Sequence, residues 1–151
     1  MGTTRTIRRG DQTFELTCED GETLLDVVRR ALGVRSASLA CQDGSCGACR
    51  ILVDGEVVNA CKVAWADVPT AARIESYEDL ASCPAAVRAV DAFCAERPTR
   101  CTLCVGALGV TAVALERAGR AGDAQAIEAA LRDATCMCTG RGSLRRALLK
   151  I

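Results

Sequence analysis

The sequence predicts an α+β protein in two parts, a mixed part of strands and helix over residues 1–78 and a helical part over 79–151. Short β-rich runs joined by glycine turns fill the first part, helical periodicity fills the second, and the cysteines fall into two separate groups. Half of the chain is hydrophobic, yet it contains one Trp, one Tyr and two Phe. Its cores must therefore be built from Ala, Val and Leu, and small cores of this kind usually need an additional covalent or metal link.

The first part begins with a predicted hairpin and helix. Residues 3–18 contain two β-rich runs joined at Gly10-Asp11. Residues 21–33, "GETLLDVVRRALG", place Leu and Val at helical spacing and end in Gly33, which we expect to cap the helix. A hairpin followed by a helix is typical of a small α+β domain.

A second hairpin is predicted over residues 50–61, "RILVDGEVVNAC". Its centre is Asp54-Gly55, the residue pair preferred in type I′ turns. A turn on that pair aligns residue 49 with residue 60 and places Cys61 diagonally beside Cys49. The hairpin therefore brings a fourth sulfur to three that precede it.

The remaining chain is predicted to be a linker and a small helical bundle. Residues 62–83 contain one strand candidate, "RIESY", at 73–77, and otherwise read as the end of the first domain and a linker. Beyond Pro84 the periodicity is helical. Four helices are expected, at 85–96, 100–118, 123–134 and 142–150.

Composition excludes several classes of protein. Nineteen basic and nineteen acidic residues balance, so no nucleic-acid partner is expected. No apolar run is long enough to span a membrane, and no signal peptide is recognisable. Eleven cysteines, an odd and clustered set, favour metal ligation in a reducing cytoplasm over disulfides. Catalytic triads, P-loops and dinucleotide fingerprints are absent, so no catalytic residue is assigned.

The first cysteine group predicts an iron–sulfur cluster. Its C-x4-C-x2-C opening is the spacing of plant-type 2Fe-2S ligation. Gly44 and Gly47 stand between these cysteines and allow the loop to turn its N–H groups toward sulfur. A structural zinc is the alternative, although zinc sites usually pair two C-x2-C knuckles. The ligands expected in this first cysteine group are Cys41, Cys46, Cys49 and Cys61.

The second cysteine group predicts a further 2Fe-2S site. A C-x2-C pair is expected in the first turn of a helix, where residues three apart share a face, and a C-x-C pair in extended chain, where residues two apart point the same way. The alternative is that these are small apolar core residues, which is what we expect of the lone Cys18, Cys83 and Cys94. The ligands expected in this second cysteine group are Cys101, Cys104, Cys136 and Cys138.

These motifs, "CQDGSCGACRILVDGEVVNAC", "CTLC" and "CMCTG", resemble the small iron–sulfur subunit of the molybdenum hydroxylases, the family of xanthine dehydrogenase, aldehyde oxidase and carbon monoxide dehydrogenase. The resemblance implies an N-terminal plant-type ferredoxin-like (β-grasp) domain and a C-terminal four-helix domain, each with one 2Fe-2S cluster. It also implies a large molybdopterin subunit and a medium FAD subunit as partners. Electrons would pass from molybdenum through the second cysteine group and the first to the flavin.

The second motif departs from the family pattern. In the family, Gln usually precedes the first cysteine and approaches the pterin. This chain has Arg100 at that position. Arginine offers a planar fork suited to a phosphate or carboxylate instead. Thr102, Met137 and Arg141 are further departures. An alternative function is therefore a two-cluster redox module, or a zinc-binding module, without a molybdenum partner.

The last predicted helix is basic, with Arg141, Arg145, Arg146 and Lys150 and no acid after Asp133. A docking surface for a partner is one interpretation. Favourable placement near a helix C-terminus and ordinary solvation is the other.

Overall fold

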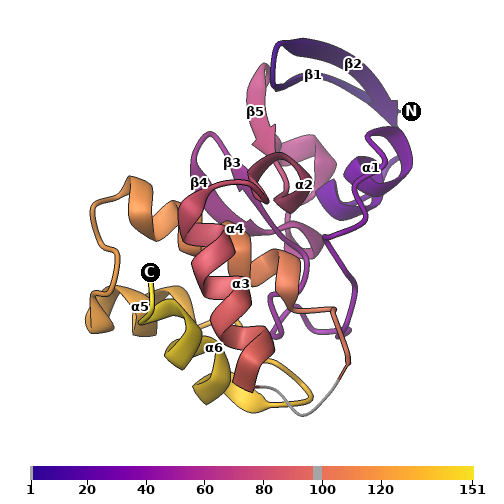
Figure 1. Cartoon of the computed structure of the whole chain (residues 1–151). Coiled ribbons are helices and arrows are strands. Elements are labelled where there is room, and N and C mark those ends of the chain that lie inside the picture. The colour runs from indigo at the N-terminus through magenta and orange to yellow at the C-terminus, as the bar shows by residue number, and fades with distance from the viewer. Residues whose placement is uncertain (1, 97–99) are drawn as a thin grey trace.

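The structure is a computed structural model that describes residues 2–96 and 100–151. It is α+β, as predicted, with the strands gathered at one end of the molecule and the longer helices at the other (Figure 1). Residue 1 of the first predicted part and residues 97–99 of the second lie outside the described residues. In the described ranges, no helix combines the length and the apolar character needed to cross a bilayer.

Five strands form one mixed sheet, in the order β2-β1-β5-β3-β4. Strands β1 and β5 run parallel, and the other neighbours are antiparallel. The predicted β3–β4 register is confirmed, because Arg50 pairs with Asn59 around a turn in which Asp54 and Gly55 both have positive φ. The strands are β1 Thr3–Arg9, β2 Gln12–Cys18, β3 Arg50–Val53, β4 Glu56–Asn59 and β5 Ala72–Glu75.

Helix α1 (Leu24–Ala31) covers the sheet with its apolar face. A capping box between Thr23 and Asp26 begins the helix, and Gly33 follows its C-cap with φ of 64°, as the sequence predicted. Two short 3-10 helices, η1 (Ala60–Lys62) and η2 (Trp65–Asp67), complete this half. Its core contains Ile7, Leu24, Val27, Val28, Ile51, Trp65 and Ile74.

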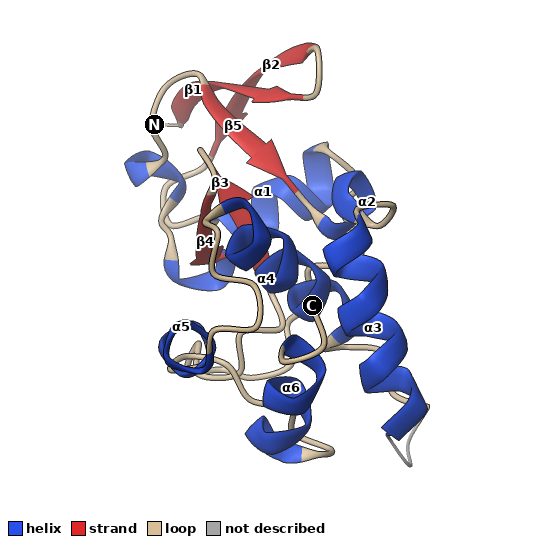
Figure 2. Cartoon of the chain, turned by 60° about the vertical axis from the view of Figure 1, so that its left-hand side comes forward, coloured by secondary structure: helices blue, strands red, loops and turns tan. Residues whose placement is uncertain are grey.

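The longer helices pack around α4, nine of whose thirteen residues are buried (Figure 2). Small residues permit this close packing, since a Cβ added at Gly109 would overlap the ring of Tyr77 on the one-turn helix α2 (Tyr77–Leu80). The helices of this half are α3 Pro84–Glu96, α4 Val105–Arg117, α5 Ala124–Ala130 and α6 Gly140–Leu148.

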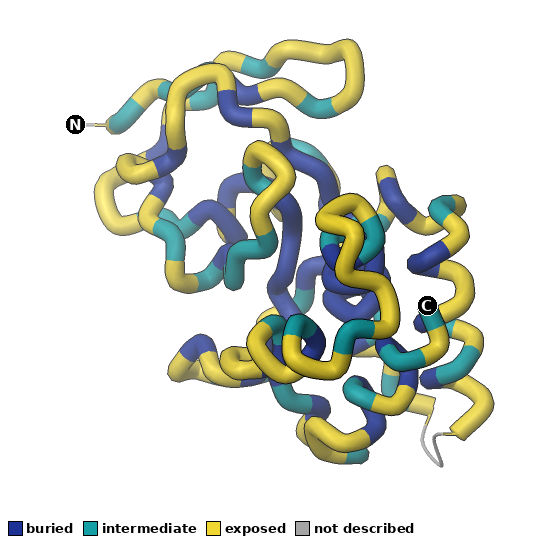
Figure 3. Tube along the Cα trace, turned by 90° about the vertical axis from the view of Figure 1, so that its left-hand side faces the viewer, coloured by how far each residue is buried: buried dark blue, intermediate teal, exposed yellow. Residues whose placement is uncertain are grey.

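The strand-rich and helical halves share apolar contacts. Leu52 of β3, Leu80 of α2 and Val110 of α4 belong to one buried cluster. Glu75 of β5 accepts two hydrogen bonds from the guanidinium of Arg117, at 2.9 and 3.1 Å. Figure 3 shows buried chain running from the sheet into the helices, while the β1–β2 hairpin is mostly exposed.

Several predicted boundaries were wrong. The strand predicted over 73–77 ends at Glu75, because Ser76 and Asp79 form a capping box that begins α2. The helix predicted over 100–118 begins only at Val105, and the one predicted over 123–134 ends at Ala130. The last helix begins at Gly140 and ends at Leu148 instead of spanning 142–150.

Candidate metal centres

The first cysteine group comes together at the loop before β3 and at η1. Cys41, Cys46 and Cys49 lie on the loop, and the β3–β4 hairpin returns Cys61 to them, as the register predicted. The backbone N–H of Cys61 lies 3.5 Å from Cys49 Sγ and donates to it. The hydrogen bond from Ser38 N to Ala48 O, at 3.0 Å, closes the loop at its base.

Glycine conformation shapes this loop. Gly44 and Gly47 have φ of 75° and 69°, the left-handed region that glycine occupies at little cost. The turn at Gly47 directs the Ala48 N–H to Cys46 Sγ at 3.4 Å. A Cβ at Gly47 would lie 2.7 Å from the carbonyl oxygen of Asp133, so the loop approaches the second cysteine group too closely for any side chain there.

The thiols of the first cysteine group influence one another's pKa. Hydrogen bonds from the Cys46 and Gly44 backbone lower the pKa of Cys41. Burial raises the pKa of Cys46, and burial together with the neighbouring thiols raises that of Cys61 to about 12. The thiols of this group are therefore close enough to affect one another's protonation, and a bound cation would displace protons from them.

The second cysteine group comes together at the starts of α4 and α6. Cys104 is the N-cap of α4, and Cys101 precedes the helix instead of lying in its first turn. Residues 137–139 form a turn, so Cys136 and Cys138 are not in extended chain either. The two local conformations predicted for these pairs were wrong. The loops nevertheless bring Cys104 beside Cys136 and Cys101 beside Cys138.

Burial divides the second cysteine group. Cys104 and Cys136 are buried, Cys101 is half-buried and Cys138 is exposed. Burial, with the nearby Cys136, raises the pKa of Cys104 to about 12. Burial alone would raise the pKa of Cys136 too, but hydrogen bonds from the Thr139 hydroxyl and the Thr139 and Cys138 N–H groups lower it.

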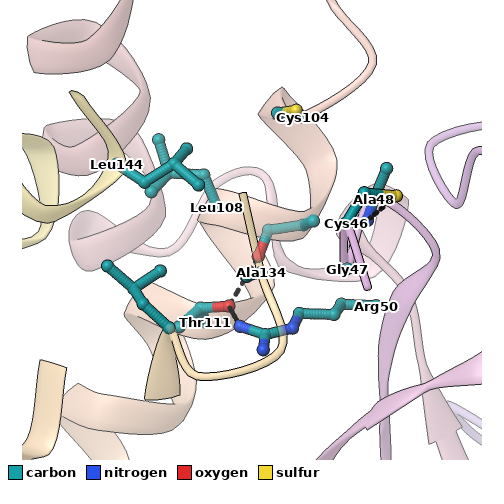
Figure 4. Close-up of a pocket in the computed structure, with 11 residues that line it drawn as sticks. Cys46, Gly47, Ala48, Arg50, Cys104, Leu108, Thr111, Ala134 and Leu144 are labelled. Carbon is teal, nitrogen blue, oxygen red and sulfur yellow. Dashed lines mark hydrogen bonds between the residues drawn. The ribbon is translucent and has the colours of Figure 1, made fainter. Parts of the chain in front are cut away.

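The two cysteine groups lie next to each other, and hydrogen bonds join their loops. Thr135 N, one residue before Cys136, donates to the carbonyl of Cys46 at 2.9 Å. Asn59 Nδ2 donates to Gly44 O at 3.1 Å and to Asp133 O at 3.0 Å, and so holds the two loops together. Cys46 and Cys104 line one small cavity of about 10 Å³, together with Gly47, Arg50 and Thr111 among other residues (Figure 4).

Sequence reasoning missed Asn59 and Arg50. One signal for Arg50 was available: a charged residue opens the otherwise apolar run "RILV" directly after Cys49, and the structure buries it. No comparable signal marks Asn59, because its partners Gly44 and Asp133 are distant in the sequence.

None of the eleven cysteines forms a disulfide. Of the lone cysteines, Cys18 is buried in the core and Cys83 packs on the cluster between the halves. Cys94 is exposed, so the expectation that it packs was wrong, because it lies on the solvent side of α3. Within the described ranges, no group of three or more His, Cys, Asp or Glu is arranged to hold a single metal ion.

The remaining predicted residues lie at the surface. Arg100 is exposed, next to Cys101 at the rim of the second cysteine group, and Met137 is 69% exposed beside Cys138. The arginines of α6 have local partners: Arg145 pairs with Glu128, Arg146 pairs with Glu96, and Arg141 donates to the carbonyls of Ala134 and Arg132. These contacts give the arginines partners within the described chain, although exposed ion pairs of this kind contribute little to stability.

A family model described as "2Fe-2S iron-sulfur cluster binding domain" matches residues 7–88. The chain is 30% identical over 144 residues to a probable xanthine dehydrogenase subunit of Bacillus subtilis, covering 93% of this chain and 80% of that one. It is 30% identical over 130 residues to the nicotine 6-hydroxylase small subunit of Paenarthrobacter nicotinovorans, covering 85% and 76%.

Two solved structures share the fold. The aldehyde oxidoreductase of Desulfovibrio desulfuricans aligns over 97% of this chain and 16% of its own, with a TM-score of 0.80 and 25% identity. Quinoline 2-oxidoreductase of Pseudomonas putida 86 aligns over 98% of this chain and 91% of the matched chain, with a TM-score of 0.78 and 21% identity.

Proposed function

This chain belongs to the small iron–sulfur subunits of the molybdenum hydroxylases, and on that basis we propose that it carries two 2Fe-2S clusters and passes electrons between them. Each cysteine group would hold one cluster. When bound, a 2Fe-2S cluster takes up and gives back one electron at a time. The ligands would be Cys41, Cys46, Cys49 and Cys61 for the first cluster, and Cys101, Cys104, Cys136 and Cys138 for the second.

The first cysteine group fits an anionic cluster. Backbone N–H groups of Ala48 on the loop and of Cys61 on η1 already donate to Cys46 and Cys49 sulfur, which is the interaction that stabilises thiolates bound to iron. The positive φ of Gly44 and Gly47 is what lets so short a loop bring three sulfurs together. This backbone arrangement is the observation that carries the proposal.

The second cysteine group fits a cluster through different features. Its cysteines lie directly before α4 and α6, whose free N–H groups and positive dipole ends favour an anion. Thr139 orients Cys136 with two hydrogen bonds. The exposed Cys138 and Arg100 leave one side of this group open, which suits contact with a larger partner.

The proposed route of electrons runs from a large molybdopterin subunit to the second cluster, then to the first, and on to an FAD subunit. The proximity of the two cysteine groups supports the middle step, because Cys46 and Cys104 line one small cavity. We place the domain boundary at residues 78 and 79, between a ferredoxin-like domain and a four-helix domain. The reducing cytoplasm is the proposed compartment.

A two-cluster redox module without a molybdenum partner is the second candidate. The observation that favours it is Arg100, an exposed cation at the position beside the second cluster where the family pattern has Gln. Purification of the native protein together with a large molybdopterin-containing chain would reject this candidate.

Serine substitutions test the ligand assignment. Cys46→Ser should abolish one of two electron paramagnetic resonance signals of the reduced protein, and Cys104→Ser should abolish the other. The control is Cys94→Ser, which replaces an exposed lone cysteine and should leave both signals intact. Two undiminished signals in either ligand variant would overturn the assignment.

A further inference from the structure

Arg50 is a buried cation that lines the same cavity as Cys46 of the first cysteine group and Cys104 of the second. It follows Cys49 directly, opens β3, and is only 6% exposed. Figure 4 shows its side chain extending from the strand beside Cys46 and Gly47 toward Thr111 of α4. Arginine keeps its charge at any ordinary pH, even though burial lowers the pKa of this one. The fold therefore contains a permanent positive charge at this position.

The hydrogen-bond partners of Arg50 are neutral. Its Nε donates to Asn59 Oδ1 at 3.1 Å, and one terminal nitrogen donates to Thr111 Oγ1 at 3.1 Å. The Thr111 hydroxyl donates in turn to Ala107 O at 2.8 Å. Asn59 and Thr111 thus fix the guanidinium in position without supplying an opposite charge.

No carboxylate of the described residues lies within 4.0 Å of the Arg50 guanidinium. Arg117 offers a contrast, because it lies at the surface and still binds both oxygens of Glu75. A buried charge is costly unless an opposite charge lies nearby. Among neighbouring groups, the Asp133 carboxylate has the largest electrostatic effect on Arg50, and smaller effects come from Cys49 and Cys46, which are proposed cluster ligands.

We propose that Arg50 is the built-in counter-cation of the first cluster, and that it holds the reduction potential of that cluster up. This inference rests on the proposed function. A 2Fe-2S cluster with four thiolates has a formal charge of about −2 when oxidised and gains one more negative charge on reduction. A fixed cation stabilises the reduced form more than the oxidised form. Arg50 would thus influence electron flow indirectly, through the reduction potential of the first cluster.

The geometry also predicts which cluster feels the charge more. Arg50 is adjacent in sequence to Cys49, and the thiols that act on it are Cys49 and Cys46 of the first cysteine group, whereas Cys104 of the second group shares only the lining of a cavity with it. Removal of the charge should therefore lower the potential of the first cluster more than that of the second. The difference in reduction potential between the two clusters would change accordingly.

The test is a redox titration of the full chain with both clusters bound, followed by electron paramagnetic resonance. Arg50→Gln removes the charge and keeps hydrogen-bonding capacity, and it should reduce the one-electron reduction constant of the first cluster about tenfold, which corresponds to about 59 mV. Arg50→Lys keeps the charge and should restore most of the difference. The control, Arg8→Gln, removes an exposed charge on β1, two strands away from β3, and should shift neither potential.

Each outcome has a defined meaning. A first-cluster potential that is equal in Arg50→Gln and Arg8→Gln would overturn the inference. So would equal shifts in Arg50→Gln and Arg50→Lys, because they would assign the effect to shape and not to charge. If Arg50→Gln does not retain its clusters, Arg50→Lys must retain both; loss in the lysine variant would also overturn it. Wild-type protein without two iron–sulfur signals would reject the proposed function itself, which distinguishes the two failures.

Discussion

Three cysteines of the first cysteine group lie on one loop and the fourth lies on η1, whereas the second group is assembled from two loops that precede helices. In the first, Cys46 and Cys49 are 4% and 2% exposed, and their sulfurs accept hydrogen bonds from the backbone N–H groups of Ala48 and Cys61. Cys41 and Cys61 of the first group are half-buried, as is Cys101 of the second, and Cys138 is the one exposed cysteine among the eight expected ligands. The same chemical group would thus be held in a more enclosed site and in a more open one, and the difference lies at Cys138.

This difference is instructive about the roles of the two sites. An enclosed site keeps water and oxidants from the sulfurs and depends on tight backbone packing. An open site leaves an edge for electrons to enter from a partner protein. The two sites meet where the Gly47 turn touches Asp133, so the packing of the enclosed site also positions the loop of the open one.

Gly47→Ala is expected to have the largest effect. Its Cβ would meet the Asp133 carbonyl at 2.7 Å in a left-handed conformation, and the combined cost is about 3 kcal/mol. The midpoint of thermal unfolding, followed by circular dichroism under anaerobic conditions, should fall by roughly 10 °C.

Gly44→Ala is the matched control for Gly47→Ala. Gly44 has a similar φ of 75°, but the atoms nearest to its Cβ would be those of the exposed Lys62 side chain, which can move aside. The expected cost is about 1–2 kcal/mol, from backbone conformation alone. Equal losses in the two variants would mean that the contact between the two loops contributes nothing.

Chelation should separate the two sites. Because Cys138 is exposed while Cys46 and Cys49 are buried, the second cluster should lose iron to ethylenediaminetetraacetate and ferricyanide on the order of tenfold faster than the first. Resonance spectra of samples reduced at successive times measure the two signals separately. Faster loss of the first signal would contradict the enclosed and open description.

Glu78→Gln should have the smallest effect. Glu78 accepts hydrogen bonds from Arg35 N, Ser36 N and Ser36 Oγ, and so ties the segment before the first cysteine loop to α2. Burial raises its pKa, but these hydrogen bonds outweigh burial and lower the pKa from 4.5 to about 2. A lowered folded-state pKa means that the stabilisation is present above pH 4.5 and is lost as the pH falls toward 2.

The expected loss of unfolding free energy in Glu78→Gln is about 1 kcal/mol at pH 7, since the carboxylate is largely exposed and screened by solvent. Thermal midpoints at pH 7 and pH 4 measure it, and the difference from wild type should shrink at pH 4. Glu15→Gln, at an exposed position on β2, should show no such difference. A gap that widens at pH 4 would contradict the assignment.

The parts predictable from the sequence were those governed by local signals. Asp54-Gly55 set the register of β3 and β4 and so the approach of Cys61 to Cys49. The conformation around Cys101 and Cys104 was not predictable, because Cys104 caps α4 without a side-chain hydrogen bond and carries no helix-start signal. The bond from Arg50 to Thr111 joins residues 61 apart, and only the fold brings them together.

Chemical analysis of the anaerobically purified full chain for iron and acid-labile sulfide tests the central claim most directly. Two 2Fe-2S clusters predict about four iron atoms and about four sulfides per chain. A folded chain that contains neither iron nor sulfide, or that contains zinc in their place, would contradict the claim.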